Sequence, residues 1–115
     1  EPIDLAVLGL GSNGHIGFNE PGEYAVAESH VVDLSEESRK HPMAESRPSA
    51  PTRGITLGMK AILNSRAIIL VVTGRAKREQ LARLLDGQIT PRFPASFLLL
   101  HRRVYCLADH EAFNG

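Results

Sequence analysis

The sequence predicts an α/β fold in which helices cover a mostly parallel sheet. Continuous apolar runs bounded by turn residues, over 3–8 and 67–74, are typical of buried strands. An amphipathic pattern over 78–85 predicts a helix, and a further apolar run follows at 104–108, so strands and helices alternate. A glycine-rich loop over 9–22 directly follows the first strand, which is where open α/β sheets build ligand sites.

The composition limits the classes of function. The 115 residues suffice for one modest domain, and 13 basic residues balance 13 acidic ones. The chain therefore has no bulk attraction for nucleic acid or an anionic membrane, and we expect neither as a partner. No apolar run approaches the roughly 18 residues of a membrane span. The one cysteine, Cys106, allows no disulfide framework and fits a cytoplasmic protein.

The segment between the two long apolar runs mixes loops with short elements. The run over 30–34 predicts a short strand, and Ser35 with the acids after it predicts the start of a short helix. Three prolines over 42–51 predict a loop. We expect a helix over 52–64, because apolar residues recur there at helical spacing. These apolar residues are Ile55, Met59, Ile62 and Leu63.

The last third of the chain predicts two helices and a strand. A turn at Gly74 leads into the helix over 78–85, which ends before a second glycine. Pro94 at its first position suits a short helix over 94–100. The run over 104–108 is the last expected strand, and we expect a terminal turn after it.

The glycine-rich loop carries side chains suited to catalysis. His15 and Glu20 offer an imidazole and a carboxylate, and Asn13 can hold such groups in place by hydrogen bonds. The glycines around them, Gly14 included, allow a ligand to approach the backbone closely. A turn histidine without catalytic function is the alternative interpretation.

The same loop mimics a dinucleotide-binding fingerprint. Gly9, Gly11 and Gly14 have the spacing of that motif. Pro21 disfavours the helix that a dinucleotide site requires after its glycines. The sequence therefore does not favour a dinucleotide, and without a cluster of ligand residues it predicts neither a metal nor another cofactor.

Lys77 is the candidate for binding a phosphate group. A turn at Gly74 that opens a helix presents backbone N–H groups and the positive end of the helix dipole, to which the lysine adds a full charge. Arg53 is a second candidate for binding the phosphate, because it lies at a predicted loop-to-helix junction beside a glycine. From the residues alone, a solvated surface lysine is an equally good interpretation.

The loop motif resembles that of a known family. Residues 9–21 have the sequence Gly-x-Gly-x-Asn-Gly-His-Ile-Gly-Phe-Asn-Glu-Pro, which resembles the signature of the glucosamine-6-phosphate deaminase/isomerase family. Further landmarks of that family stand in the same order at 51–58, 71–77 and 94–101. The resemblance implies a Rossmann-like three-layer fold, of which residues 1–115 would be the C-terminal part. The absent N-terminal half would be a partner, and a second copy of the chain is a further candidate.

The resemblance also implies an activity. His15 would open the ring of a hexosamine 6-phosphate with Glu20 as its partner, and Lys77 would bind the substrate phosphate. The products would be a ketohexose 6-phosphate and ammonia, as in amino-sugar catabolism, and no cofactor would be needed. The base that moves a proton between C2 and C1 would be an aspartate of the absent half, so we expect the chain alone to be inactive.

Two departures from the family pattern leave the substrate open. Many relatives carry Asp where this chain has Asn13, although an Asn variant also occurs in the family. A phosphate-binding Arg of many relatives has no counterpart at 42–44, so either His41 or Arg53 would substitute or the phosphate would be held differently. Residues 52–58 and 94–97 resemble the galactosamine-6-phosphate branch most closely, and we expect galactosamine 6-phosphate before glucosamine 6-phosphate.

Two alternative functions remain open. A 6-phosphogluconolactonase resembles this family in fold and has a similar Gly-His loop, but it typically continues with small hydroxyl residues where this chain has Phe18-Asn19-Glu20-Pro21. A sugar-phosphate-sensing regulatory domain of this fold would not need the pair of His15 and Glu20. An upstream helix-turn-helix would favour such a sensor.

Overall fold

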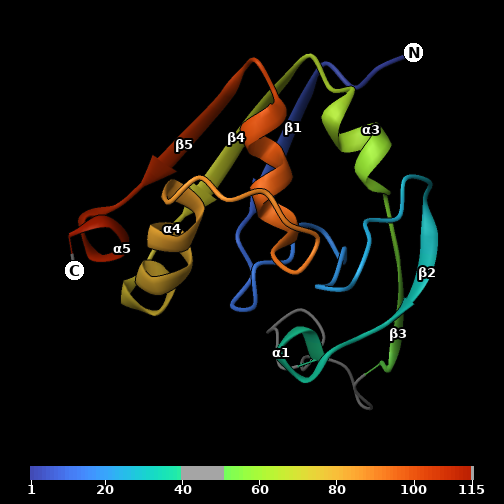
Figure 1. Ribbon diagram of the computed structural model, residues 1–115, viewed down its shortest axis with the longest axis horizontal. Coiled ribbons are helices and arrows are strands. Elements are labelled where there is room, and N and C mark those ends of the chain that lie inside the picture. Colours follow the sequence, from blue (N-terminus) through green and yellow to red (C-terminus); the bar gives the residue numbers. More distant parts are fainter. Residues whose placement is uncertain (40–50, 115) are drawn as a thin grey trace.

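The computed structural model describes residues 1–39 and 51–114 (Figure 1). It contains a three-stranded sheet, a separate pair of strands and short helices around them. The loop predicted over 42–51 lies outside the described residues except for its last residue. In the described part, no helix is long and apolar enough to span a lipid bilayer.

The three-stranded sheet is parallel, as the sequence predicts. β1 (Leu5–Gly9), β4 (Ala67–Val72) and β5 (Val104–Ala108) lie in the order β1-β4-β5. β4 is continuously apolar, which suits the central place where both strand edges are paired. Leu70 of this strand pairs with Leu8 of β1 and fixes the register.

One face of this sheet carries the core. Ile68, Leu70 and Val72 of β4 alternate with more exposed residues and are at most 1% exposed. Two helices pack on that face (Figure 1). They are α4 (Arg78–Leu85), as predicted, and the 3₁₀ helix η2 (Pro94–Leu100), which starts at the predicted proline.

The opposite face of the sheet is open in the described part of the chain. Leu5 and Val7 of β1, with Tyr105 and Leu107 of β5, are at least 50% exposed. Ile69 pairs with both Val7 and Tyr105, so these residues form one continuous apolar surface. The α/β class and the parallel sheet are confirmed. The described residues do not form the second helical layer that the family resemblance implies.

A pair of antiparallel strands stands apart from this sheet. β2 (His30–Asp33) pairs with β3 (Arg53–Thr56). The helix predicted over 52–64 is wrong in its first half, because only α3 (Met59–Leu63) is helical. Ile55 matches the helical spacing but lies on β3 and is 77% exposed. Its β-branched side chain and the pairing with β2 favour a strand over a helix.

The remaining elements are short. α1 (Glu36–Arg39) begins directly after Ser35, as predicted. The 3₁₀ turn η1 (Arg75–Lys77) leads into α4. The predicted terminal turn is wrong, because residues His110–Phe113 form the short helix α5. It forms because the Asp109 carboxylate caps it, accepting a backbone N–H of its first turn at 2.8 Å.

Candidate active site

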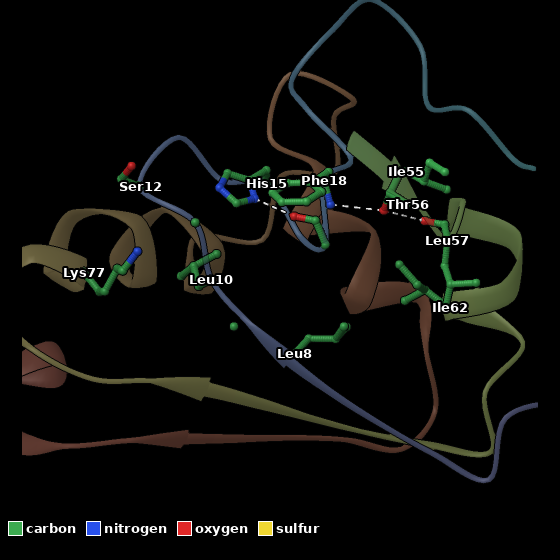
Figure 2. A pocket seen from close by; sticks show the side chains of 13 residues that line it. Leu8, Leu10, Ser12, His15, Phe18, Ile55, Thr56, Leu57, Ile62 and Lys77 are labelled. Atoms are coloured by element: carbon green, nitrogen blue, oxygen red, sulfur yellow. Dashed lines mark hydrogen bonds between the residues drawn. The ribbon is translucent and has the colours of Figure 1, made fainter. Parts of the chain in front are cut away.

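A pocket of about 480 Å³ opens at the carboxyl end of β1 (Figure 2). The end of β1 and the loop after it form one wall, and β3 with α3 forms another. Apolar and glycine residues supply most of the lining. The polar side chains that line it are Ser12, His15, Thr56 and Lys77. The structure thus brings His15 and Lys77, two predicted site residues, to the same pocket.

The loop after β1 folds back on itself through backbone hydrogen bonds. Gly11 N–H donates to the His15 carbonyl at 2.9 Å, and Gly14 N–H donates to the Gly11 carbonyl at 3.0 Å. Gly14 has a φ of +91°, and an added Cβ there would collide with the Phe93 ring. Its carbonyl accepts Ala95 N–H at 2.9 Å. Gly14 does not line the pocket, so the structure gives it a role in shaping the loop.

His15 is held in one tautomer. Its Nδ1 lies 2.8 Å from the Gly17 carbonyl oxygen. Because a carbonyl only accepts hydrogen bonds, Nδ1 carries the hydrogen, and Nε2 of the neutral ring keeps its lone pair. Gly11 leaves room for the imidazole, which a Cβ at that position would strike. The half-buried ring can therefore accept a proton at Nε2.

Asn13 links His15 to Glu20. Its Oδ1 accepts the His15 backbone N–H at 3.1 Å, and its Nδ2 donates to Glu20 Oε2 at 3.0 Å. An amide suits this position, because it both accepts and donates, whereas an ionised carboxylate only accepts. The family resemblance implies Glu20 as the partner of His15. The structure instead gives Nδ1 the Gly17 carbonyl as its partner, and joins Glu20 to His15 through Asn13.

The wall formed by β3 was not predicted. Thr56 Oγ1 accepts Phe18 N–H at 3.1 Å, and Asn19 Nδ2 donates to the Leu57 carbonyl at 2.8 Å. These bonds tie the second half of the loop to the strand. These bonds have no sequence signal, because the burial of Asn19, which is 6% exposed and therefore needs partners for its amide, is visible only in the structure.

Lys77 ends η1 at one side of the pocket. Figure 2 shows it on one side of His15 and the β3 residue Thr56 on the other. Burial lowers the pKa of the Lys77 amine, because removal from water disfavours its charged form. Among the described residues no carboxylate forms an ion pair with it. An anion in the pocket would therefore be its counterion.

The other two predicted phosphate ligands lie elsewhere. Gly74 has a φ of +92°, and its N–H donates to both Asp109 carboxylate oxygens at 3.1 Å. The amide is occupied, and the carboxylate beside it would repel a phosphate. Arg53 lies on β3, exposed, 3.8 Å from an Asp33 oxygen. Neither residue lines the pocket with Lys77.

The chemistry of the site follows from its few polar groups. An imidazole can take and return a proton, and an ammonium can bind an anionic group of the same ligand. Within residues 1–39 and 51–114, no three His, Cys, Asp or Glu side chains stand together as metal ligands. The pocket suits a small molecule that carries both an exchangeable proton and a negative charge.

Comparison with known proteins places the chain in a family. The sequence model of the family described as glucosamine-6-phosphate isomerases/6-phosphogluconolactonase matches residues 1–106. The chain belongs to this family. Within it, a glucosamine-6-phosphate deaminase of Clostridium botulinum (strain Kyoto / Type A2) is 44% identical over 112 residues, which are 96% of this chain and 46% of the relative.

Solved structures of the glucosamine-6-phosphate isomerase/6-phosphogluconolactonase family share the fold. A glucosamine-6-phosphate deaminase described as monomeric is 45% identical, with a TM-score of 0.88 over 95% of this chain and 46% of that one. A 6-phosphogluconolactonase from Trypanosoma brucei is 27% identical, with a TM-score of 0.72 over 95% of this chain and 40% of that one. The chain thus spans about half the length of the relatives that it matches.

Proposed function

We propose that the chain is the C-terminal part of a cytoplasmic deaminase/isomerase of amino-sugar catabolism. Its substrate would be a hexosamine 6-phosphate, and its products a ketohexose 6-phosphate and ammonia. The observation that carries this proposal is a pocket lined both by His15, with Nε2 free to accept a proton, and by the half-buried Lys77. The longer protein that would contain this chain is called the full-length protein below.

Each residue has a step that its chemistry suits. A pyranose must open before its C2 hydrogen becomes acidic, and His15 Nε2 would take the proton of the C1 hydroxyl and return it to the ring oxygen. Lys77 would hold the phosphate at the other end of the sugar. Moving a proton from C2 to C1 then gives an imine at C2, and water converts this imine to a ketone and ammonia.

The substrate panel that tests this function contains three compounds. The full-length protein should release ammonia from galactosamine 6-phosphate and glucosamine 6-phosphate, with the higher kcat/KM for galactosamine 6-phosphate. The third compound, 6-phosphogluconolactone, should not be hydrolysed. Binding of both amino-sugar phosphates without turnover would contradict the proposal and favour a sugar-phosphate sensor.

A lactonase is the second candidate function. The matching family includes 6-phosphogluconolactonases, and the similarity to the Trypanosoma brucei enzyme extends over 95% of this chain. A histidine that activates water and a lysine that binds phosphate would serve lactone hydrolysis as well. Hydrolysis of the lactone without ammonia release from either amino sugar would establish this alternative.

Lys77 should control the affinity for the phosphate group. We expect Lys77→Met to raise KM about 10- to 100-fold, since a hydrogen bond to a charged group contributes roughly 1.5–3 kcal/mol. As the pH rises through the lowered pKa of Lys77, the amine loses its charge, so kcat/KM should fall. Lys77→Arg should move this fall to higher pH, because an arginine stays charged.

The control for this prediction is Lys60→Arg. Lys60 is exposed and lies 3.4 Å from a Glu28 carboxylate oxygen, outside the pocket. This substitution should leave the pH profile of kcat/KM unchanged. An unaltered KM in Lys77→Met would place the phosphate site elsewhere.

The chain of 115 residues should not deaminate by itself. The base that moves the C2 proton would belong to the remaining half, and the aspartates of this chain are poorly placed for that role. Asp33 and Asp4 form exposed ion pairs, Asp86 is exposed at the end of α4, and Asp109 caps a helix. Ammonia release is measured for the chain and for the full-length protein at equal concentration. A comparable rate from the chain alone would assign the base to its own residues.

A further inference from the structure

A glutamine on α4 contacts the loop that follows β1. Gln80 lies one helical turn after Lys77, and its Nε2 donates to the Ser12 carbonyl at 2.7 Å. The amide orientation is settled by chemistry, because a carbonyl oxygen can face only the nitrogen of the glutamine amide. The bond joins residues 68 positions apart, so it connects the helix after β4 to the loop after β1.

This hydrogen bond constrains the peptide that leads into Asn13. In a planar trans peptide the C=O of Ser12 and the N–H of Asn13 point in opposite directions. Holding the Ser12 carbonyl toward α4 therefore fixes the plane of the Ser12–Asn13 peptide. The Asn13 side chain begins at the end of that peptide, and it accepts from His15 N–H and donates to Glu20.

The oxygen atom of the Gln80 amide indicates a role beyond stability. Gln80 Oε1 is buried and has no hydrogen-bond partner in the described part of the chain. A buried acceptor without a partner lowers stability, and an apolar side chain of the same length would avoid this loss. A residue that leaves one buried acceptor unpaired in the described part of the chain, while its Nε2 bonds to the loop at 2.7 Å, fits a role in the site.

We propose that Gln80 is a positioning residue that locks the Ser12–Asn13 peptide and thereby the alignment of His15. It also sets the spacing between the loop and Lys77, because Lys77 and Gln80 stand on consecutive turns. The effect of this alignment on catalysis rests on the proposed function, whereas the locking of the loop does not.

The test uses Gln80→Met and Gln80→Glu in the full-length protein. Met keeps the length and removes the donor, and Glu places a carboxylate against the Ser12 carbonyl. We expect Gln80→Met to keep or raise Tm, to speed amide exchange at Gly11 and Gly14 about tenfold, and to lower kcat about 10- to 100-fold with a smaller change in KM. Gln80→Glu should lower kcat further.

The control is Glu79→Met on the exposed side of the same helix. This substitution should change neither the amide exchange rates nor kcat. Wild-type exchange rates and a wild-type kcat in Gln80→Met would overturn the proposal. A lower Tm with unchanged exchange and kcat would also overturn it, since that result describes a purely structural residue. If the unmodified protein deaminates neither amino sugar, the proposed function fails, while the exchange rates still decide whether Gln80 locks the loop.

Discussion

His15→Gln in the full-length protein should lower kcat for amino-sugar phosphates about 10²- to 10⁴-fold, the range for removal of a general acid-base group. The amide of glutamine can form hydrogen bonds, but it does not take up and release a proton at neutral pH. KM should change little, because Lys77 and the apolar lining remain. Steady-state kinetics with both amino-sugar phosphates measure this effect.

His30→Gln is the matched control for His15. The Nδ1 of His30 lies 2.8 Å from the Glu28 carbonyl oxygen, two residues earlier in the chain, so its local geometry is similar. His30 does not line the pocket. We expect wild-type kinetics for this variant. A kcat within about threefold of wild type in His15→Gln would remove His15 from the mechanism.

Gly14→Ala should cause a large loss of stability. A residue with a side chain at a φ of +91° loses about 1–2 kcal/mol. The new methyl group would also strike Phe93, which is 1% exposed and lies under the Arg83 guanidinium at 4.5 Å, so the ring has little room to move. Overpacking of this kind adds about 1–3 kcal/mol.

Gly87→Ala is the control that separates the conformational cost from the cost of overpacking. Gly87 has a φ of +88°, but an added Cβ would meet no atom within 4 Å. The control should therefore lose only the conformational part, about 1–2 kcal/mol. Urea denaturation of the full-length variants measures both free energies of unfolding. Equal decreases in the free energy of unfolding of the two variants would show that the Phe93 ring moves aside. In that case its packing against Gly14 does not fix the shape of the loop.

The parallel sheet could be predicted because its strands carry their own signal. The residues of β4 are continuously apolar and are bounded by turn residues, a pattern that few other structures satisfy. The strand β3 could not be predicted in this way. Ile55 falls by chance at helical spacing from Met59, and the partner strand that stabilises β3 lies more than twenty residues earlier.

Candidate site residues could be grouped from the sequence where they lie within one loop. Asn13, His15 and Glu20 are close in sequence, and the structure joins them. Gly74 and Arg53 lie outside the pocket, because each is bonded to an aspartate that is distant in sequence. The contribution of Gln80 had no sequence signal, since its partner is a backbone carbonyl that any residue at position 12 would provide.

The open apolar face of the sheet fits the proposal that the chain is part of a larger domain. Val7, Val71 and Leu107 are exposed on neighbouring strands, and Val71 pairs directly with Leu107. A face of this kind on a parallel sheet is normally covered by helices. The proposed remaining half would supply them, and without it we expect copies of the chain to associate through this face.

We propose that His15 and Lys77 serve the deamination of a hexosamine 6-phosphate. The most direct measurement is the simultaneous quantification of ammonia and ketohexose 6-phosphate formed by the full-length protein from galactosamine 6-phosphate. Our account predicts equal amounts of the two products, and loss of both together in His15→Gln. Formation of neither product by the unmodified protein, with hydrolysis of 6-phosphogluconolactone in its place, would contradict it.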